Sequence, residues 1–335
     1  MRKPPRHILR KKASRIIIYV ILLAGSIPIL LPFFWMLSSS MKSGDLIDEA
    51  PPRWIPQSRE SLAQIDGREV QVNVISEGGR DEPSRVRIMA TGEVKDVAPQ
   101  LVRTVRRFDP HPENYREALK REPFHKYFVN TLFITVCCII GQVLSCALVG
   151  YAFARIQFRG RGVLFLVLLS TMMIPAQITM IPRFIIFVKL GWLDSFKPLT
   201  VPAFLATNAF FVFLFRQFFL TIPVDLEDAA RIDGCGPLGT FWHVMLPIAR
   251  PAAVTTAVFT FIWTWNDFLG PLIYINSDEK RTLALALDSF KTMYGYADIH
   301  LLMAASVMMI LPSLIIFFIA QRAFIRGVVV TGLKG

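Results

Sequence analysis

Charged residues are scarce in this sequence. Asp, Glu, Lys and Arg make up only 19% of its 335 residues, whereas a soluble protein of this length usually carries about a quarter. The scarcity is concentrated in long apolar runs, and roughly 20 apolar helical residues are enough to cross a bilayer core about 30 Å thick. The composition therefore excludes a soluble enzyme with one large core and predicts a membrane protein.

Cysteine, histidine and nucleotide-binding motifs are also few or missing. The chain has four cysteines and five histidines, and they show no Cys/His spacing typical of a zinc site. No G-x-x-x-x-G-K-S/T phosphate loop occurs. We therefore expect no structural disulfide, no metal or other cofactor bound by this chain, and no enzyme activity of its own.

Six apolar runs are long enough to be predicted as membrane-spanning helices. The expected fold class is therefore an all-α polytopic membrane protein with six transmembrane helices. Prolines within several runs predict kinks, because neighbouring helices can satisfy the carbonyls that a proline leaves free. The predicted spans are Ile16–Leu37, Phe128–Ala154, Gly162–Val188, Thr200–Phe215 (or as far as Leu220), Ala252–Tyr274 and Leu301–Gln321.

The first span could instead be a cleaved signal peptide. Its apolar run of 22 residues is longer than an ordinary signal-peptide core, contains Pro28 and Pro32, and lacks a clear small-x-small cleavage site. We therefore expect a retained helix. Cleavage would leave the other five spans and their orientation unchanged.

Basic residues beside the spans set the expected orientation. The first fifteen residues carry seven Lys or Arg and no acid, the loop after the second span carries three arginines, and the C-terminal tail is also basic. The positive-inside rule places all three in the cytoplasm, so we expect a multi-pass protein of the plasma (inner) membrane with both termini cytoplasmic. The expected domains are a cytoplasmic N-terminus at 1–15, the first helix at 16–37, an extracytoplasmic insertion at 38–127, a five-helix core at 128–321 and a cytoplasmic tail at 322–335.

The polar insertion at 38–127 is too long for a simple loop. Alternating apolar and polar residues at Glu69–Ile75, Arg85–Met89 and Leu101–Phe108 are typical of short antiparallel strands. We predict a small β-rich extracytoplasmic insertion at about 58–108, followed by a short helix at Glu113–Lys120. Residues 39–126 include 15 basic and 15 acidic residues, which argues against a nucleic-acid-binding arm.

The cytoplasmic loop at 222–251 carries a short helix with its own start and stop signals. Asp225 is expected as the N-cap, Glu227 and Arg231 as an i,i+4 ion pair, and Gly234 as a left-handed stop. Pro237 then opens a second helix. The apolar stripe predicted on this second helix consists of Leu238, Phe241, Trp242 and Met245.

So short a helix is marginal by itself, because helix nucleation is costly. Its small residues and flanking acids suit insertion into a groove on another protein. An amphipathic connector lying on the membrane surface would have the same periodicity.

Residues Glu227–Gly234, followed by Leu246-Pro247, resemble the "EAA" loop of permease subunits in binding-protein-dependent ABC importers. Within that family the chain is most similar to the carbohydrate-uptake branch, to the shorter permease of the maltose-transporter type. The resemblance covers about 1–55 and 109–335 and leaves the β-rich insertion outside. The chain departs from the family pattern at Asp228, where glutamate is usual, and at Cys235, where a small residue is usual. Further matches are Asn114-Tyr115, Asn130–Leu132, Trp263–Phe268 and the tail from Gln321 to Gly335.

The resemblance implies a mechanism and a set of partners. Two homologous permease subunits form the pathway, two ATPase subunits bind ATP and Mg beneath them, and an extracytoplasmic solute-binding protein delivers the solute. Membrane lipid surrounds the complex, and no nucleic acid is involved. Each permease's loop helix enters a groove on one ATPase. The coupling residues that the resemblance implies are Glu227, Asp228, Ala229, Ala230, Asp233, Gly234 and Pro247.

Polar residues within the predicted spans are the candidates for the solute path, because such residues are costly in lipid and usually face the interior of a helix bundle. Each of them could instead serve helix–helix hydrogen bonding or anchor the helix at the interface. The two tryptophans could stack on a sugar ring. The candidates are Gln142, Asn208, Trp263, Trp265, Asn266 and Asp267, with Ser145, Thr171 and Gln177 as further polar positions.

The expected function is thus a permease subunit of an ATP-driven importer that carries a sugar or related solute by alternating access. Importers of other solute classes, such as polyol phosphates, peptides or amino acids, share the loop and remain alternatives. A secondary transporter is a further alternative, which an inverted repeat and paired charges at mid-membrane would favour. A membrane-anchored structural protein would leave the acidic Ala-Ala loop without a purpose.

Overall fold

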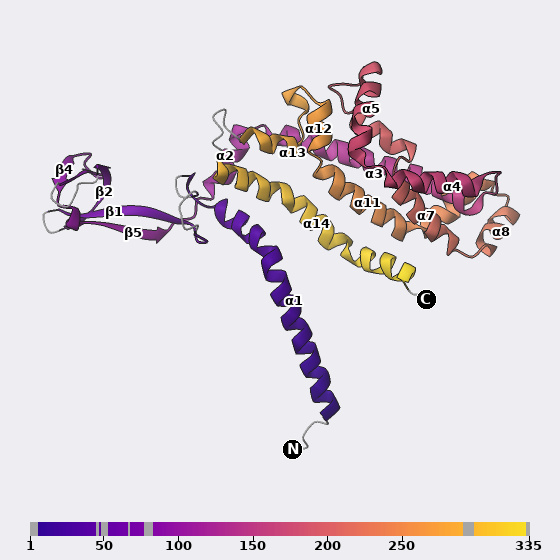
Figure 1. The fold of residues 1–335 in the computed structure, drawn as a ribbon, viewed down its shortest axis with the longest axis horizontal. Coiled ribbons are helices and arrows are strands. Elements are labelled where there is room, and N and C mark those ends of the chain that lie inside the picture. Colours follow the sequence, from indigo (N-terminus) through magenta and orange to yellow (C-terminus); the bar gives the residue numbers. More distant parts are fainter. Residues whose placement is uncertain are drawn as a thin grey trace. The chain divides into compact units, whose positions relative to one another are not determined.

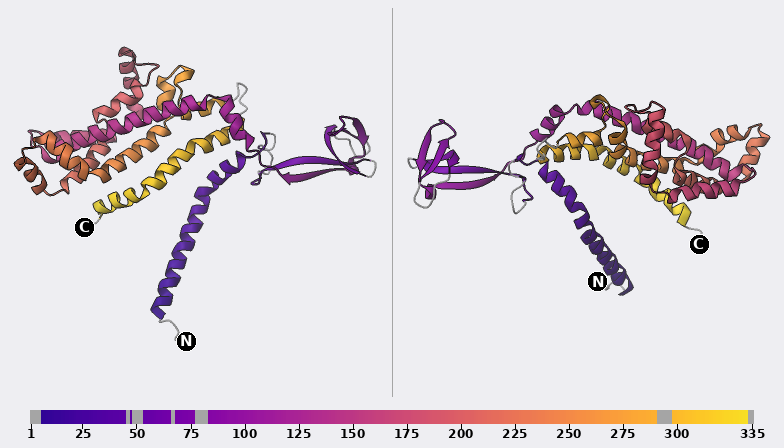
Figure 2. Two further views of the ribbon diagram at one scale, coloured as in Figure 1. Left: turned by 180° about the vertical axis from the view of Figure 1, so that it is seen from behind. Right: turned by 45° about the horizontal axis from the view of Figure 1, so that its top comes forward.

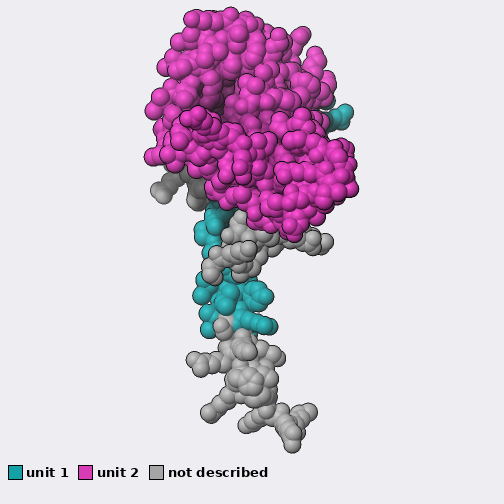
Figure 3. All heavy atoms as spheres, turned by 90° about the vertical axis from the view of Figure 1, so that its right-hand side faces the viewer, with its two compact units in different colours: residues 1–121, 290–307 teal, residues 122–289, 308–335 magenta. Residues whose placement is uncertain are grey.

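The computed structural model describes residues 6–44, 47, 53–65, 68–76, 83–290 and 298–332 (Figure 1). The chain divides into two compact units, coloured separately in Figure 3. One comprises residues 1–121 and 290–307, and the other comprises residues 122–289 and 308–335.

The first unit begins with helix α1 (Arg6–Ser39), which continues through Pro28 and Pro32. Its apolar side chains from Ile16 onward are mostly exposed, as expected for a helix that faces lipid or another subunit. At the end of α1, the buried residues all lie in one short polar stretch. There Asn114 donates both amide N–H groups, to the carbonyls of Ser40 (3.0 Å) and Lys42 (2.8 Å).

A five-stranded antiparallel sheet follows α1, with strand order β4-β3-β2-β1-β5 (Figure 2). The three alternating runs in the sequence lie on β2, β3 and β5. On β2 and β3 every second side chain faces a small core built on Ala63, Val72 and Val86, and β5 contributes Val102 to it. Apolar and polar residues alternate less regularly on β1 and β4, so the sequence did not predict these two strands. The strands are β1 (Gln57–Ile65), β2 (Arg68–Ser76), β3 (Ser84–Ile88), β4 (Val94–Val97) and β5 (Val102–Phe108), with the 3-10 turn η2 (Pro99–Leu101) before β5.

Helix α2 (Glu113–Arg121) lies at the end of residues 1–121 of this unit. It confirms the helix expected at Glu113–Lys120. Glu113 in its first turn and two basic residues in its last turn suit the helix dipole. A hydrogen bond from the backbone N–H of Glu113 itself, followed by the His111 side chain, lowers the pKa of the Glu113 carboxyl from its usual value.

The second unit is helical. Helix α3 (Phe124–Arg155) is its centre and packs against α7 (Ala209–Leu220) and α11 (Arg250–Trp265). Aromatic and sulfur-containing side chains form the core between them, including Tyr151, Phe215 and Phe219. The other elements are α4 (Arg161–Ser170), η3 (Thr171–Met173), α5 (Ala176–Lys189), α6 (Lys197–Thr200), η4 (Val201–Leu205), α8 (Asp225–Ile232), α9 (Pro237–Thr240), η5 (Phe241–Met245), α10 (Leu246–Ile248), α12 (Leu269–Tyr274), η6 (Asp278–Lys280), α13 (Leu283–Ala286), η7 (Leu287–Phe290) and α14 (Ile299–Gly332).

Three predicted spans are not single helices. In the run at Thr200–Phe215, the 3-10 turn η4 ends at Leu205 and α7 begins only at Ala209. The run at Gly162–Val188 breaks before Pro175, and its two halves are bent by 101°, because a residue before proline is pushed out of the helical region. The run at Ala252–Tyr274 breaks between α11 and α12, at residues 266–268. Proline within the run at Gly162–Val188 predicted a kink there, whereas nothing in the sequence signalled the break at residues 266–268.

Among the described residues, four helices are long and apolar enough to cross a membrane. Two further helix pairs, Arg161–Met173 with Ala176–Lys189 and Pro237–Ile248 with Arg250–Trp265, are each bent at a short break and raise the number to as many as six. The four are Arg15–Ser39, Phe124–Arg155, Lys197–Leu220 and Ile299–Gln321.

Candidate functional site: an anchored loop helix and a polar cleft

Helix α8 forms the first part of the loop between α7 and α11. Asp225 is the first helical residue, and the capping position before it is Val224, which makes no side-chain cap; the expected N-cap at Asp225 is therefore wrong by one position. Asp225, Glu227 and Asp228 nevertheless stand in the first turn, where carboxylates are favoured by the positive end of the helix dipole.

Glu227 is buried, with only 3% of its side chain exposed, and its Oε1 lies 2.9 Å from Nε of Arg155 on α3. The predicted i,i+4 pair with Arg231 is therefore wrong. Arg231 instead contacts Asp228, at 3.3 Å between exposed groups. Arg155 also donates to the carbonyls of Phe219 (2.8 Å) and Ile222, so the end of α3, the end of α7 and α8 meet at one guanidinium.

Gly234 ends α8 with φ +85°, which confirms the predicted left-handed stop. The N–H of Cys235 donates to the carbonyl of Ala230 (2.9 Å), and the N–H of Gly234 donates to that of Arg231 (3.0 Å). These two bonds form a Schellman motif, which satisfies carbonyls at the end of the helix.

The face of α8 that is not packed against α3 is exposed at Asp228 and Ala229, and the turn after it is exposed at Asp233 and Gly234, whereas Ala230 is buried. Pro237 opens α9 as expected.

The single apolar stripe expected after Pro237 is wrong. Phe241 and Met245 are buried, whereas Leu238 and Trp242 remain 63% and 50% exposed. The backbone at Phe241–Met245 is π-helical, and its wider turn separates residues that would share one face of an α-helix. Pro247 lies in α10, between this turn and α11.

A cleft of about 250 Å³ lies in the second unit, among α3, α5, α6, η4, α7, α11 and α12. Four of the six predicted path residues line it: Gln142, Asn208, Trp263 and Asp267. Lining residues that the sequence did not single out include Arg183, Phe187, Thr207, Thr260, Thr264 and Tyr274.

The two remaining predicted path residues do not line the cleft. Trp265 is buried, its Nε1 donates to the carbonyl of Met309 (3.0 Å), and its ring stacks on Phe261. Asn266 is exposed and donates to the carbonyl of Ile262 (2.8 Å) on its own helix. Both have structural roles in this conformation. Ser145 likewise bonds locally, to the backbone of η4.

The polar residues of the cleft are held by the helices that carry them. Oδ1 of Asn208 accepts from the N–H of Phe211 and so caps α7. Oδ1 of Asp267 accepts from the N–H of Gly270 (3.0 Å) at the start of α12. A Cβ on Gly270 would overlap that carboxylate, so a larger residue there would displace the Asp267 side chain. Trp263 stacks on Phe211 and keeps 51% of its surface exposed.

Beside the cleft, Asp194 joins the loop after α5 to the loop after α12. Its carboxylate accepts from the backbone N–H groups of Asn276 (3.0 Å) and Ser277 (2.9 Å), from the Ser277 hydroxyl, and from Lys280 (3.0 Å). The hydroxyl and backbone of Ser277, followed by Lys280, hold the pKa of the Asp194 carboxyl far below its usual range. This cluster fastens two segments that line the cleft, α5 and α12.

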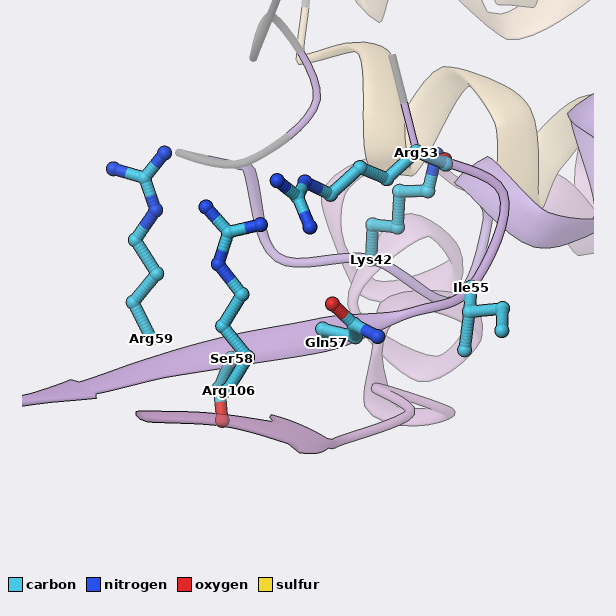
Figure 4. A pocket seen from close by; sticks show the side chains of 7 residues that line it. All are labelled: Lys42, Arg53, Ile55, Gln57, Ser58, Arg59 and Arg106. Atoms are coloured by element: carbon cyan, nitrogen blue, oxygen red, sulfur yellow. The ribbon is translucent and has the colours of Figure 1, made fainter. Parts of the chain in front are cut away.

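The first unit has an open hollow of about 550 Å³ on the sheet, lined by residues such as Ser61, Val74 and Thr104. It also has a much smaller hollow, of about 10 Å³, at the start of β1, which is lined by cations including Lys42, Arg59 and Arg106 (Figure 4). Burial lowers the pKa of Lys42. Because the smaller volume holds about one water molecule, that hollow is no candidate for a sugar site. Among the described residues, no group of three or more His, Cys, Asp or Glu could hold a metal ion.

Sequence comparisons match the second unit most directly. The family model for the inner membrane component of binding-protein-dependent transport systems matches residues 147–330. The arabinooligosaccharides transport system permease protein AraQ of Halalkalibacterium halodurans is 39% identical over 62% of this chain and 74% of its own length. The sn-glycerol-3-phosphate transport system permease protein UgpE of Shigella flexneri is 33% identical over 62% of this chain and 73% of its own.

A solved structure resembles nearly the whole chain. A chain of a bacterial ABC transporter that imports the acidic polysaccharide alginate superposes with a TM-score of 0.67 at 23% identity, over 96% of this chain and 99% of that one. The likeness shows a shared fold. With the family match over more than half of its length, the chain belongs to the inner membrane components of binding-protein-dependent transport systems.

Proposed function

We propose that this chain is one permease subunit of an ATP-driven importer and forms half of a translocation pathway for a sugar or related solute. The names of its relatives, which specify arabinooligosaccharides and sn-glycerol-3-phosphate, support a carbohydrate or polyol phosphate. Peptide or amino-acid import within the same family, and secondary transport, remain alternatives that no feature of the cleft favours.

The observation that carries this proposal is the anchored helix α8. An eight-residue helix is unstable alone, yet here the buried Arg155–Glu227 contact ties it to α3. Its outer side presents Asp228, Ala229, Asp233 and Gly234 to a groove on an ATPase subunit. Exposed Leu238 and Trp242 add apolar surface beside them. Small side chains permit close approach, and exposed apolar residues are typical of docking surfaces.

Within this proposal Glu227 acts inside the permease rather than at the ATPase surface. A displaced α8 would pull on α3 through Arg155, because the ion pair lies at 2.9 Å with little exposure. Nucleotide binding to the ATPase could then shift the equilibrium between inward- and outward-facing states, provided that the ATPase binds the two states with different affinity. Ala230 packs behind Glu227, and Pro247 guides the chain back toward α11.

The proposed topology has six spans and two cytoplasmic termini. The spans are α1, α3, the bent α4–α5 pair, the segment from α6 to α7, the α11–α12 pair and α14. This topology puts the five-stranded sheet on the extracytoplasmic side and α8 on the cytoplasmic side. The proposed partners are a second permease, two ATPase subunits that hold ATP and Mg, and a solute-binding protein.

Site-specific photo-crosslinking tests the docking surface. A photoreactive residue at Ala229, in the complex purified with its cognate subunits, should capture an ATPase. The same residue at Ile29, an exposed position in the middle of α1, should capture none. Loss of ATPase capture at Ala229, with the complex intact, would contradict the proposal.

A further inference from the structure

Arg183 differs from the other membrane-depth arginines of the second unit. It lies on α5, in the second half of the bent α4–α5 pair, and lines the cleft. It is the only lysine or arginine among the residues that line the cleft. In the proposed topology Arg183 lies within a span, where a charge is costly and usually serves a function, so this exposed arginine needs an explanation.

The hydrogen bonds of Arg183 do not explain why a charged residue lies there. Its Nη2 donates to Oγ1 of Thr179, one turn earlier on the same helix, at 3.2 Å. Among the described residues, no carboxylate lies within 4.0 Å of it. By contrast, Arg216 donates to the carbonyl of Phe153 and lies 4.2 Å from the Phe165 ring centroid. A guanidinium has five N–H donors, and most of those on Arg183 have no acceptor among the described residues.

The one acid that lines the cleft is already engaged. Asp267 accepts from the N–H of Gly270 at the start of α12 and makes no ion pair among the described residues. The rest of the lining suits a sugar. Trp263 offers a ring face for stacking, and Gln142, Asn208 and Thr207 offer hydrogen-bonding groups. The hydroxyl of Thr260, which is 4% exposed, has no hydrogen-bond partner in the described structure.

We infer that Arg183 pairs with an anionic oxygen group of the solute, so that the imported solute is an acidic sugar rather than a neutral one. A planar guanidinium binds carboxylate and phosphate groups in the same two-pronged geometry. The group is therefore the carboxylate of a uronic acid or the phosphate of a sugar or polyol ester. This inference rests on the proposed function, because it assigns the cleft to the solute path.

The test uses the complete importer in proteoliposomes, with its binding protein and ATPase. Uptake is measured for a neutral oligosaccharide, a uronate oligosaccharide of the same length, and a polyol phosphate. The variants are Arg183→Gln, Arg183→Lys and, as the matched control, Lys189→Gln, which removes an exposed cation in the last turn of the same helix without altering the cleft.

The wild-type importer should carry one of the two acidic solutes, and which one it carries distinguishes carboxylate from phosphate. Arg183→Gln should reduce that uptake about ten- to hundredfold at low solute concentration, since a hydrogen bond to a charged group contributes in this range. Arg183→Lys should restore part of it, and Lys189→Gln should change nothing. ATPase activity without solute should stay normal in all three variants, which shows that they fold and assemble.

Two results would overturn the inference while leaving the proposed function intact. One is an importer that carries only the neutral solute, and the other is full acidic-solute uptake by Arg183→Gln. A complex that neither assembles with an ATPase nor carries any of the three solutes would instead contradict the proposed function, and the inference would fall with it.

Discussion

Single side chains in this protein hold together segments that are distant in the sequence. Asn114 and Asn130 each donate two N–H groups to two carbonyls, at the end of α1 and at residues 279 and 281. Both asparagines belong to stretches that resemble the family, but the sequence could not say what they bind. Arg155 also links distant segments, through a charged guanidinium that contacts two carbonyls and the carboxylate of Glu227.

The Arg155–Glu227 pair makes the first prediction. Glu227→Ala removes the carboxylate that faces the guanidinium of Arg155, whose side chain is only 10% exposed. The substitution should lower the free energy of unfolding by about 3–5 kcal/mol, because an uncompensated buried charge is costly. Asp228→Ala removes an exposed partner of Arg231 and should cost less than about 1 kcal/mol. Unfolding of the purified complex in detergent measures both, and equal effects would contradict the distinction.

Asp194 makes the second prediction, which concerns pH. Its pKa is lowered in the folded state by Ser277 and Lys280, so its stabilising contribution is present above the unfolded pKa of about 3.9. The contribution is lost as pH falls from there through the folded pKa. Asp194→Asn should therefore lower the melting temperature at pH 7, and the difference from wild type should shrink at pH 3.

Asparagine is a suitable replacement at this position, because Asp194 has φ +51° and asparagine tolerates the left-handed region. A melting-temperature difference that is the same at pH 7 and pH 3 would show that the carboxylate charge contributes nothing.

At the scale of elements, the breaks in the helices matter more than their lengths. The breaks before α5 and α12 let short helices line the cleft where continuous helices would have run past it. The π-helical turn at Phe241–Met245 similarly divides an apolar stripe into a buried half and an exposed half. Proline explains the first break, and sequence periodicity signalled neither the second nor the π turn.

Gly234, at the end of α8, makes the third prediction. Its φ of +85° is unfavourable for any residue with a Cβ, and most unfavourable for a β-branched one. The transport rate should therefore be reduced least by Gly234→Asn, more by Gly234→Ala and most by Gly234→Val. Backbone strain should cost about 1–2 kcal/mol in the alanine variant, and the protein should still fold.

Gly236 is the matched control for Gly234. It has φ −73° and open space around its Cβ position, so Gly236→Val should leave solute uptake and solute-stimulated ATPase activity unchanged. Wild-type activity in Gly234→Val would refute the role assigned to the turn.

At the scale of the whole molecule, a polytopic helical protein carries an antiparallel sheet between its first two long helices. The sheet has its own small core, and its strands pair only with one another. It lies outside the part matched by the family model, yet the structural likeness to the alginate importer chain covers nearly the whole sequence.

The proposed topology makes the fourth prediction. Cysteines introduced at Met89, in the turn after β3, and at Ala229 in α8, two exposed positions, should react with a membrane-impermeant thiol reagent from opposite sides of the membrane. Met89→Cys should be labelled from outside intact spheroplasts, and Ala229→Cys only after permeabilisation. Labelling of both from one side would contradict the six-span arrangement.

Local sequence alone was enough to predict the membrane character, the short helix α8 and its glycine stop. These features depend on local hydropathy and on backbone preferences of single residues such as Gly234 and Pro237. Only the tertiary structure decided that Glu227 faces Arg155, that Trp265 is buried while Trp263 is open, and that Arg183 lines the cleft. These features depend on contacts between residues far apart in the chain, and such contacts leave no periodic trace in one sequence.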